Sequence, residues 1–140
     1  MSVVVKFFEL LLLAIGCLFN PFILILVTFP LIANLATAFV YSRSRGKDVL
    51  SPHTFLPIGW SMLILAVGAI FAYHGKPAAA PPWSENVVYV LLFLQLAHCV
   101  WLTFKNANRR WITIAVCLLF LLFGLTCTMM SLTSMTNQWE

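Results

Sequence analysis

The chain has 140 residues, enough for one domain, and its eight Lys and Arg against four Asp and Glu give a formal charge of +4. Hydrophobic residues make up 62% of it and charged residues only 9%, with a mean hydropathy of +0.99. This composition is far outside the range of soluble domains, so the chain requires a bilayer as solvent. A basic excess in a membrane protein reports orientation before it reports an acidic partner.

Two hydrophobic stretches, residues 3–19 and 21–41, open the chain and are separated by Asn20-Pro21. One helix over both would be about 58 Å long, roughly twice the hydrocarbon thickness. Asn suits the end of a helix and Pro the first turn of the next, so we predict a helical hairpin here. The alternative is an interfacial helix over residues 3–19. We favour insertion, because only Lys6 and Glu9 interrupt the apolar surface and an interfacial helix needs a broad polar face.

A cleaved N-terminal signal is not expected. Lys6 precedes an apolar core, but residues 14–17, Ala-Ile-Gly-Cys, match a lipoprotein cleavage box poorly.

Three further hydrophobic segments follow a basic loop at residues 42–54. The third segment contains Gly68 and Ala72 at a spacing that allows close helix approach. A connector rich in Pro and Ala, residues 74–85, follows it. The sequence thus predicts transmembrane helices at residues 57–73, 86–104 and 111–132.

Basic residues predict the orientation of these helices. Three follow the second segment, three follow the fourth, and the connector between has only Lys76. Loops rich in Lys and Arg face the cytoplasm, so we predict that loops 42–54 and 105–110 are cytoplasmic and the C-terminus is outside. The N-terminus is then inside if residues 3–19 span. This cytoplasmic basic face comprises Arg43, Arg45, Lys47, Lys105, Arg109 and Arg110.

Four polar side chains within the hydrophobic segments are the candidate functional residues: Gln95, His98, Glu9 and Asn34. Gln95 falls at the middle of its segment, and His98 lies one turn further on the same helix face. Each has a plainer interpretation. Glu9 is three residues from Lys6 and is more simply a local ion pair, whereas Gln95 and His98 are more simply bonds to a facing helix.

No cofactor or metal is predicted. The four cysteines lie inside apolar runs without a CxxC motif and are interpreted as small buried hydrophobic residues. A haem subunit is a less favoured hypothesis, because His98 and His74 differ by roughly 20 Å in depth and only His98 from two subunits could supply paired axial ligands.

Two resemblances bear on function. The acidic Glu9 in the first helix of a small helical protein resembles the small multidrug transporters, but it lies too near the N-terminus and the glycine-rich packing of that family is missing. In gross layout the chain is also similar to small membrane subunits of bacterial defence operons, although no motif carries that likeness.

The sequence therefore predicts an all-α integral membrane protein of four spans plus a fifth, N-terminal hydrophobic helix, with no soluble domain and no enzyme motif. We predict a non-catalytic anchor or sensor in a bacterial inner membrane, forming a homo-oligomer or part of a larger complex. Its basic face would dock a cytoplasmic protein or anionic lipid, whereas nucleic acid is not expected. The alternative is a small oligomeric channel or transporter, including an effector of a defence operon. Polar groups would line a wet lumen in a channel and dry helix contacts in an anchor.

Overall fold

The computed structural model describes residues 2–20, 52–72, 81–106 and 110–136, with Ile32, Leu35, Ala36 and Val40 as isolated helical residues. Every regular element in this part of the chain is helical. The elements are α1 (Val3–Leu18), the 3-10 helix η2 (Pro52–Phe55), α4 (Pro57–Ala72), α5 (Trp83–Lys105) and α6 (Arg110–Thr136).

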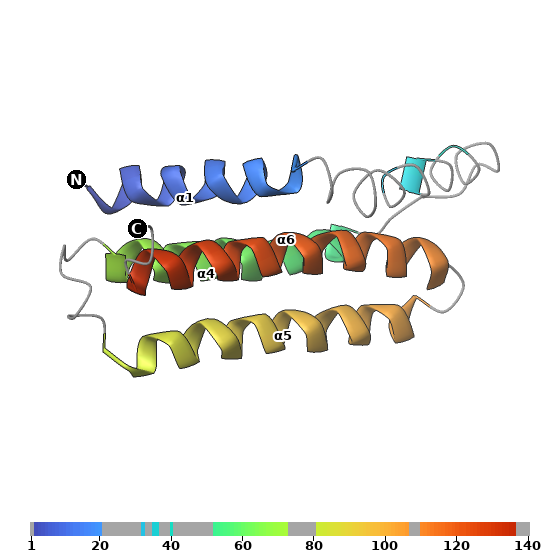
Figure 1. The fold of residues 1–140 in the computed structure, drawn as a ribbon. Coiled ribbons are helices and arrows are strands. Elements are labelled where there is room, and N and C mark those ends of the chain that lie inside the picture. Colours follow the sequence, from blue (N-terminus) through green and yellow to red (C-terminus); the bar gives the residue numbers. More distant parts are fainter. Residues whose placement is uncertain are drawn as a thin grey trace.

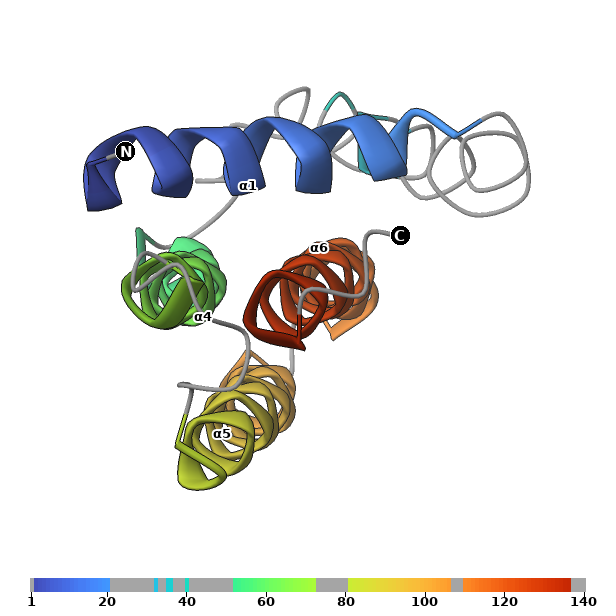
Figure 2. The ribbon, with the colours of Figure 1, turned by 60° about the vertical axis from the view of Figure 1, so that its left-hand side comes forward.

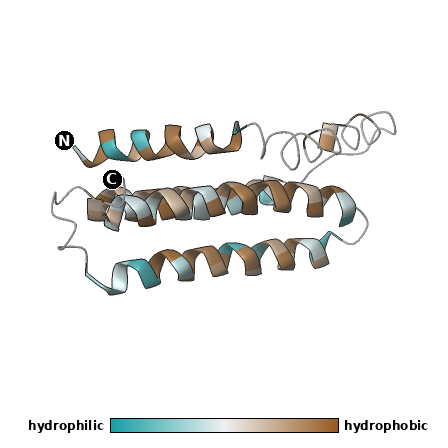
Figure 3. Cartoon of the chain, viewed as in Figure 1, coloured by the Kyte–Doolittle hydropathy of each residue, from teal (hydrophilic) through white to brown (hydrophobic). Residues whose placement is uncertain are grey.

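Three of these helical stretches are long and apolar enough to cross a membrane: His53–Ala72, Trp83–Lys105 and Arg110–Thr136. At about 1.5 Å per residue they measure about 30, 34 and 40 Å, which matches or exceeds a hydrocarbon core of about 30 Å. In Figure 3 apolar residues, coloured brown, recur along the visible faces of α5 and α6. A helix that is apolar on all sides is expected where lipid, rather than water, surrounds the bundle.

The three membrane-length helices form a bundle, and α1 lies across it. Figure 1 shows α4 and α6 running in the same direction. The helix α5, which lies between them in the sequence, runs in the opposite direction. Seen nearly end-on in Figure 2, the three helices form a triangle, and α1 crosses obliquely over α4 and α6 on the side away from α5. Of the three membrane-length helices, α5 has the smallest buried share, because α1 packs on α4 and α6.

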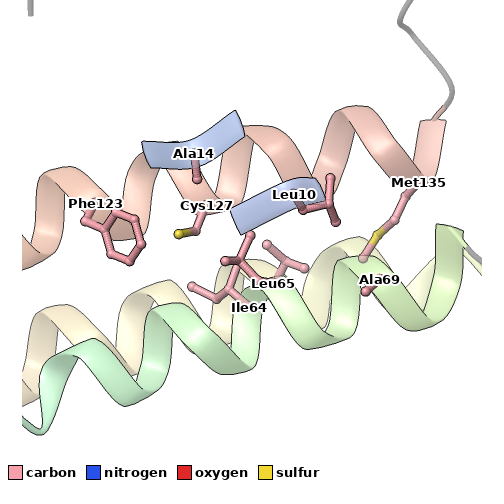
Figure 4. Close-up of a cluster of buried hydrophobic side chains, with 9 residues drawn as sticks. Leu10, Ala14, Ile64, Leu65, Ala69, Phe123, Cys127 and Met135 are labelled. Carbon is pink, nitrogen blue, oxygen red and sulfur yellow. The ribbon is translucent and has the colours of Figure 1, made fainter. Parts of the chain in front are cut away.

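A buried apolar layer joins α1 to α4 and α6. Figure 4 shows Leu10 and Ala14 of α1 lying over the contact between α4 and α6, and both are fully buried. Because lipid tails are as apolar as leucine, this contact is stabilised mainly by close packing rather than by removal of surface from water. The remaining members of the cluster are Ile64, Leu65, Ala69, Val88, Phe123, Cys127 and Met135.

The first predicted helix is present, and its neighbour in sequence falls outside the described residues. Ser2 caps α1 by accepting a bond from the Val5 amide at 3.3 Å, and the helix ends just before Asn20, where the sequence predicts a break. The described residues contain four α-helices, not the five predicted, because the segment 21–41 is described only at its four isolated residues.

The sides of the membrane on which the two termini lie stay a prediction. A spanning hairpin would put the start of α1 and the end of α6 on opposite sides, but both lie at the same end of the bundle in Figure 1. At 16 residues, α1 is about 24 Å long and is not among the helices of membrane-crossing length. Its oblique crossing shortens its reach along the bundle axis further.

Three predicted boundaries are also corrected. The fourth helix begins at Trp83 rather than Asn86, since the Ser84 hydroxyl bonds the Pro81 carbonyl at 2.7 Å and Glu85 favours the positive end of the helix dipole. The last helix runs to Thr136 rather than 132, with the Thr136 hydroxyl bonded to the Leu132 carbonyl at 2.9 Å. Part of the predicted loop 42–54 is the 3-10 helix η2.

Candidate functional site

Gln95 lies where α4, α5 and α6 meet. Its side chain is 0% exposed, because the buried face of α5 places it toward the bundle axis. The amide Nε2 donates to Ser61 Oγ of α4 at 3.1 Å and to the Phe120 carbonyl of α6 at 2.8 Å. One amide thus joins the three membrane-length helices, at the middle of the segment where an unpaired polar group would cost most.

Gly124 makes room for this amide. A methyl group built on Gly124 would overlap Gln95 Oε1 and stand 2.8 Å from Cδ and 2.9 Å from Nε2. The buried Oε1 has no conventional hydrogen-bond partner among the described residues, and it faces the Gly124 backbone, which has no side chain to displace it. A carbonyl oxygen against the Cα of a facing glycine is a recurring weak contact between closely packed helices.

Gly68 provides a second close approach, between α4 and α6. A Cβ added there would lie 2.5 Å from Ser131 Oγ and 2.8 Å from the Ser131 Cα, which is backbone. The Ser131 hydroxyl donates to the Ile64 carbonyl at 3.0 Å. Of the predicted packing pair Gly68 and Ala72, Gly68 therefore sits in the contact, while Ala72 is only half-buried.

His98 lies one turn beyond Gln95 but toward the outside of the bundle. The Trp60 indole Nε1 of α4 donates to His98 Nδ1 at 3.1 Å. Because an indole nitrogen is a donor only, Nδ1 must be the acceptor, and the proton of the neutral imidazole is carried by Nε2. The Trp101 ring packs edge-on against the imidazole, with centroids 5.8 Å apart, and Lys105 Nζ lies 4.6 Å above the Trp101 ring.

Glu9 forms the local pair that its spacing suggests. Lys6 Nζ and Glu9 Oε2 are 3.1 Å apart on the first turns of α1, with both side chains partly exposed. This pair is on the far side of α4 and α6 from α5 in Figure 2. The structure therefore does not bring Glu9 together with Gln95 or His98.

The remaining predicted residues fall into two groups. Lys105 and Arg110 are exposed at the same end of the bundle, at the end of α5 and the start of α6. Asn34 and the other members of the basic face lie outside the described residues. These are Arg43, Arg45, Lys47 and Arg109.

The described cysteines are all free thiols, and three of the four are buried. Cys99 of α5 and Cys117 of α6 face each other, each Sγ lying within 3.9 Å of the other residue's carbonyl oxygen. Between residues 2 and 136, the described His, Cys, Asp and Glu side chains form no group of three or more that could hold a metal ion. The thiols behave as helix-packing groups.

Comparison of the chain with protein families, with curated proteins and with solved structures gives no match. The site is therefore interpreted from its own geometry. Sequence reasoning identified Gln95 and His98 as candidates but not their partners Ser61, Gly124 and Trp60. The sequence offered only a weak indication of these partners. Ser61 and Gly124 are small residues inside apolar helices, and small residues there are typical of helix–helix contacts.

Proposed function

We propose that the chain is a non-catalytic membrane-embedded subunit, an anchor or sensor that docks a cytoplasmic partner through the basic end of its bundle. The observation that carries this proposal is the burial of Gln95, whose N–H groups bond the two neighbouring helices. An aqueous path would need such a group to face water. Here the group binds the helices to one another, as expected of a rigid anchor.

Other polar side chains in the bundle support the same interpretation. The Ser131 hydroxyl bonds the carbonyl of Ile64 across the helix contact, and the Thr128 hydroxyl bonds the carbonyl of Gly124 within α6 at 2.9 Å. All of these groups are buried. Hydroxyls that satisfy backbone carbonyls in this way strengthen helix packing and leave little polar surface for a permeating ion.

The docking part of the proposal rests on charge. Lys105 and Arg110 are exposed at one end of the bundle, and the sequence adds Arg109 beside them and three basic residues in the loop 42–54. Such a cluster attracts an acidic protein surface or anionic lipid, and it favours the cytoplasmic side for that end. The Gln95 N–H groups are bonded within one copy, so oligomer formation is not needed to satisfy them and stays a prediction.

The experiment is co-purification from native membranes after reversal of charge at positions 109 and 110. The double variant Arg109→Glu/Arg110→Glu should lose any soluble partner, while Lys76→Glu, in the connector predicted to lie outside, should retain it. Labelling of a cysteine at position 108 must show in parallel that the orientation is unchanged. Equal recovery of the partner with the double variant and with wild type would contradict docking through this pair.

A flux measurement separates the anchor from the channel alternative. Liposomes containing the purified protein should conduct ions no faster than protein-free liposomes. Conductance that wild type supports and Gln95→Leu abolishes would instead favour an oligomeric channel.

A further inference from the structure

The imidazole of His98 has one nitrogen in a hydrogen bond and one without a hydrogen-bond partner among the described residues. Nδ1 accepts from Trp60, so Nε2 carries a proton and can only donate. Nε2 has no hydrogen-bond partner among the described residues, and the ring is only half-buried. A donor left unpaired in hydrocarbon is costly, so this N–H calls for an acceptor from outside the bundle.

The depth of His98 restricts what that acceptor is. His98 lies four residues, or about 6 Å, from the middle of α5, and seven residues, or about 10 Å, from Lys105 at the basic end. The ester carbonyls and head groups of phospholipids lie near the ends of a membrane helix, at the level of Lys105. They are too far out to reach Nε2, so the acceptor must belong to a molecule that enters the hydrocarbon core.

A second copy of the chain does not supply the acceptor by symmetric pairing. Two His98 rings that each accept from their own Trp60 are both donors at Nε2, so they cannot bond one another. The large side chains exposed around the same depth on α5 are apolar. They include Leu94, Leu96 and Val100. A small ligand that dissolves in the bilayer satisfies the donor more simply.

The same tautomer disfavours metal or haem ligation through Nε2. A metal binds a nitrogen lone pair, and it needs the proton on the other nitrogen, where Trp60 already donates. The site therefore selects an oxygen acceptor rather than a cation. The neighbouring Trp101 ring, 51% exposed, offers a flat apolar surface beside the donor.

We propose that His98, Trp60 and Trp101 form a binding site for the carbonyl head group of a membrane-soluble quinone. The His98 Nε2–H donates to one ring carbonyl, and the quinone ring packs against the half-exposed Trp101 ring, which also contacts the imidazole edge and has Lys105 Nζ 4.6 Å from its centroid. Trp60 is a positioning residue that holds the imidazole in the donor tautomer. The proposal concerns binding alone and does not rest on partner docking through Arg109 and Arg110.

Photolabelling of the full chain in lipid nanodiscs tests the site. The probe is an azido derivative of a decyl-substituted benzoquinone, displaced by the unlabelled quinone. Labelling should map to α4 or α5 near His98. His98→Leu should raise the apparent Kd about fivefold, the loss expected for one neutral hydrogen bond. His98→Gln, whose amide can accept from Trp60 and still donate, should stay within about twofold of wild type.

Two further arms keep the outcome decisive. The dimethyl ether of the corresponding hydroquinone lacks both carbonyls and should displace the label poorly. Trp60→Phe should weaken quinone binding and let the imidazole proton populate Nδ1 in ¹⁵N NMR spectra. Absence of displaceable labelling, equal affinity of His98→Leu and wild type, or equal displacement by the ether would each overturn the proposal. Arg109→Glu/Arg110→Glu should leave quinone binding unchanged, which separates this result from partner docking.

Discussion

Gln95 and His98 are three residues apart on α5, but their surroundings differ in burial and in hydrogen-bond partners. Gln95 is fully enclosed, with partners on α4 and α6 and a glycine backbone against its oxygen. His98 is half-buried, with a partner on α4 alone and an exposed indole beside it. Both are polar groups within a helix that is long and apolar enough to cross a membrane.

The difference teaches that sharing a helix face is not enough to share an environment. Residues at i and i+3 are about 60° apart around the helix axis, and this rotation is enough to bury Gln95 and leave His98 half-buried. The Gln95 amide therefore bonds neighbouring helices, whereas the Nε2–H donor of His98 has no partner among the described residues. Substitutions in the two regions should separate stability from binding.

The largest expected effect is at the close contact of α4 and α6. Gly68→Leu places a large side chain where even a methyl group would stand 2.8 Å from the Ser131 Cα. Because a backbone atom cannot move aside, the helices must separate, and we expect a loss of about 3 kcal/mol in the free energy of unfolding. Reversible unfolding in SDS micelles measures it. Gly59→Leu, at an open position on the same helix, is the matched control, and equal losses would refute the contact.

The next effect is at Gly124, where the obstacle is a side chain. Gly124→Ala should displace the Gln95 amide and lower the free energy of unfolding by about 2 kcal/mol. Because Gln95→Ala removes the obstacle, adding Gly124→Ala to it should cost much less. A double-mutant cycle in the same unfolding assay would show strong coupling between the two positions. Additive losses would mean that the glycine and the amide do not meet.

The sequence predicted the helical class and the three membrane-length helices well, because runs of apolar residues of this length have few other solutions. It also identified Gln95 and His98, since polar groups stand out there. The helix ends were less accurate. Ser84 and Thr136 bond nearby carbonyls and extend α5 and α6 beyond their apolar cores, an effect that hydropathy does not register.

The orientation of α1 and the partners of Gln95 could not be predicted for a different reason. The outward side chains of α1, such as Phe8 and Leu12, are as apolar as the buried Leu10, so the pattern does not say which face packs. Gly124 and Thr128 have the small-residue spacing, but such pairs are common by chance, so the spacing alone does not identify Gly124 as a contact. Its role depends on the rotation of α5 and α6 about their axes, which only tertiary packing determines.

A smaller effect is expected when the interior amide itself is removed. Gln95→Leu has similar volume, and the freed Ser61 hydroxyl can bond a carbonyl of its own helix. Measured hydrogen bonds between membrane helices average well under 2 kcal/mol, so the free energy of unfolding should fall by about 1 kcal/mol. A loss above about 3 kcal/mol would mean that the amide does more than join the helices. Quinone binding should be unaffected.

The smallest effect on stability is expected at His98. His98→Leu removes one bond to Trp60 at the edge of the bundle and exposes a side chain that lipid solvates well, so the two changes oppose one another. The free energy of unfolding should change by less than about 0.5 kcal/mol. In the same preparation the affinity of His98→Leu for quinone should fall. Gln95→Leu should instead lower the free energy of unfolding and leave quinone affinity unchanged. If His98→Leu instead unfolds the bundle as readily as Gly124→Ala does, the imidazole is a structural group, and the contrast between the two regions fails.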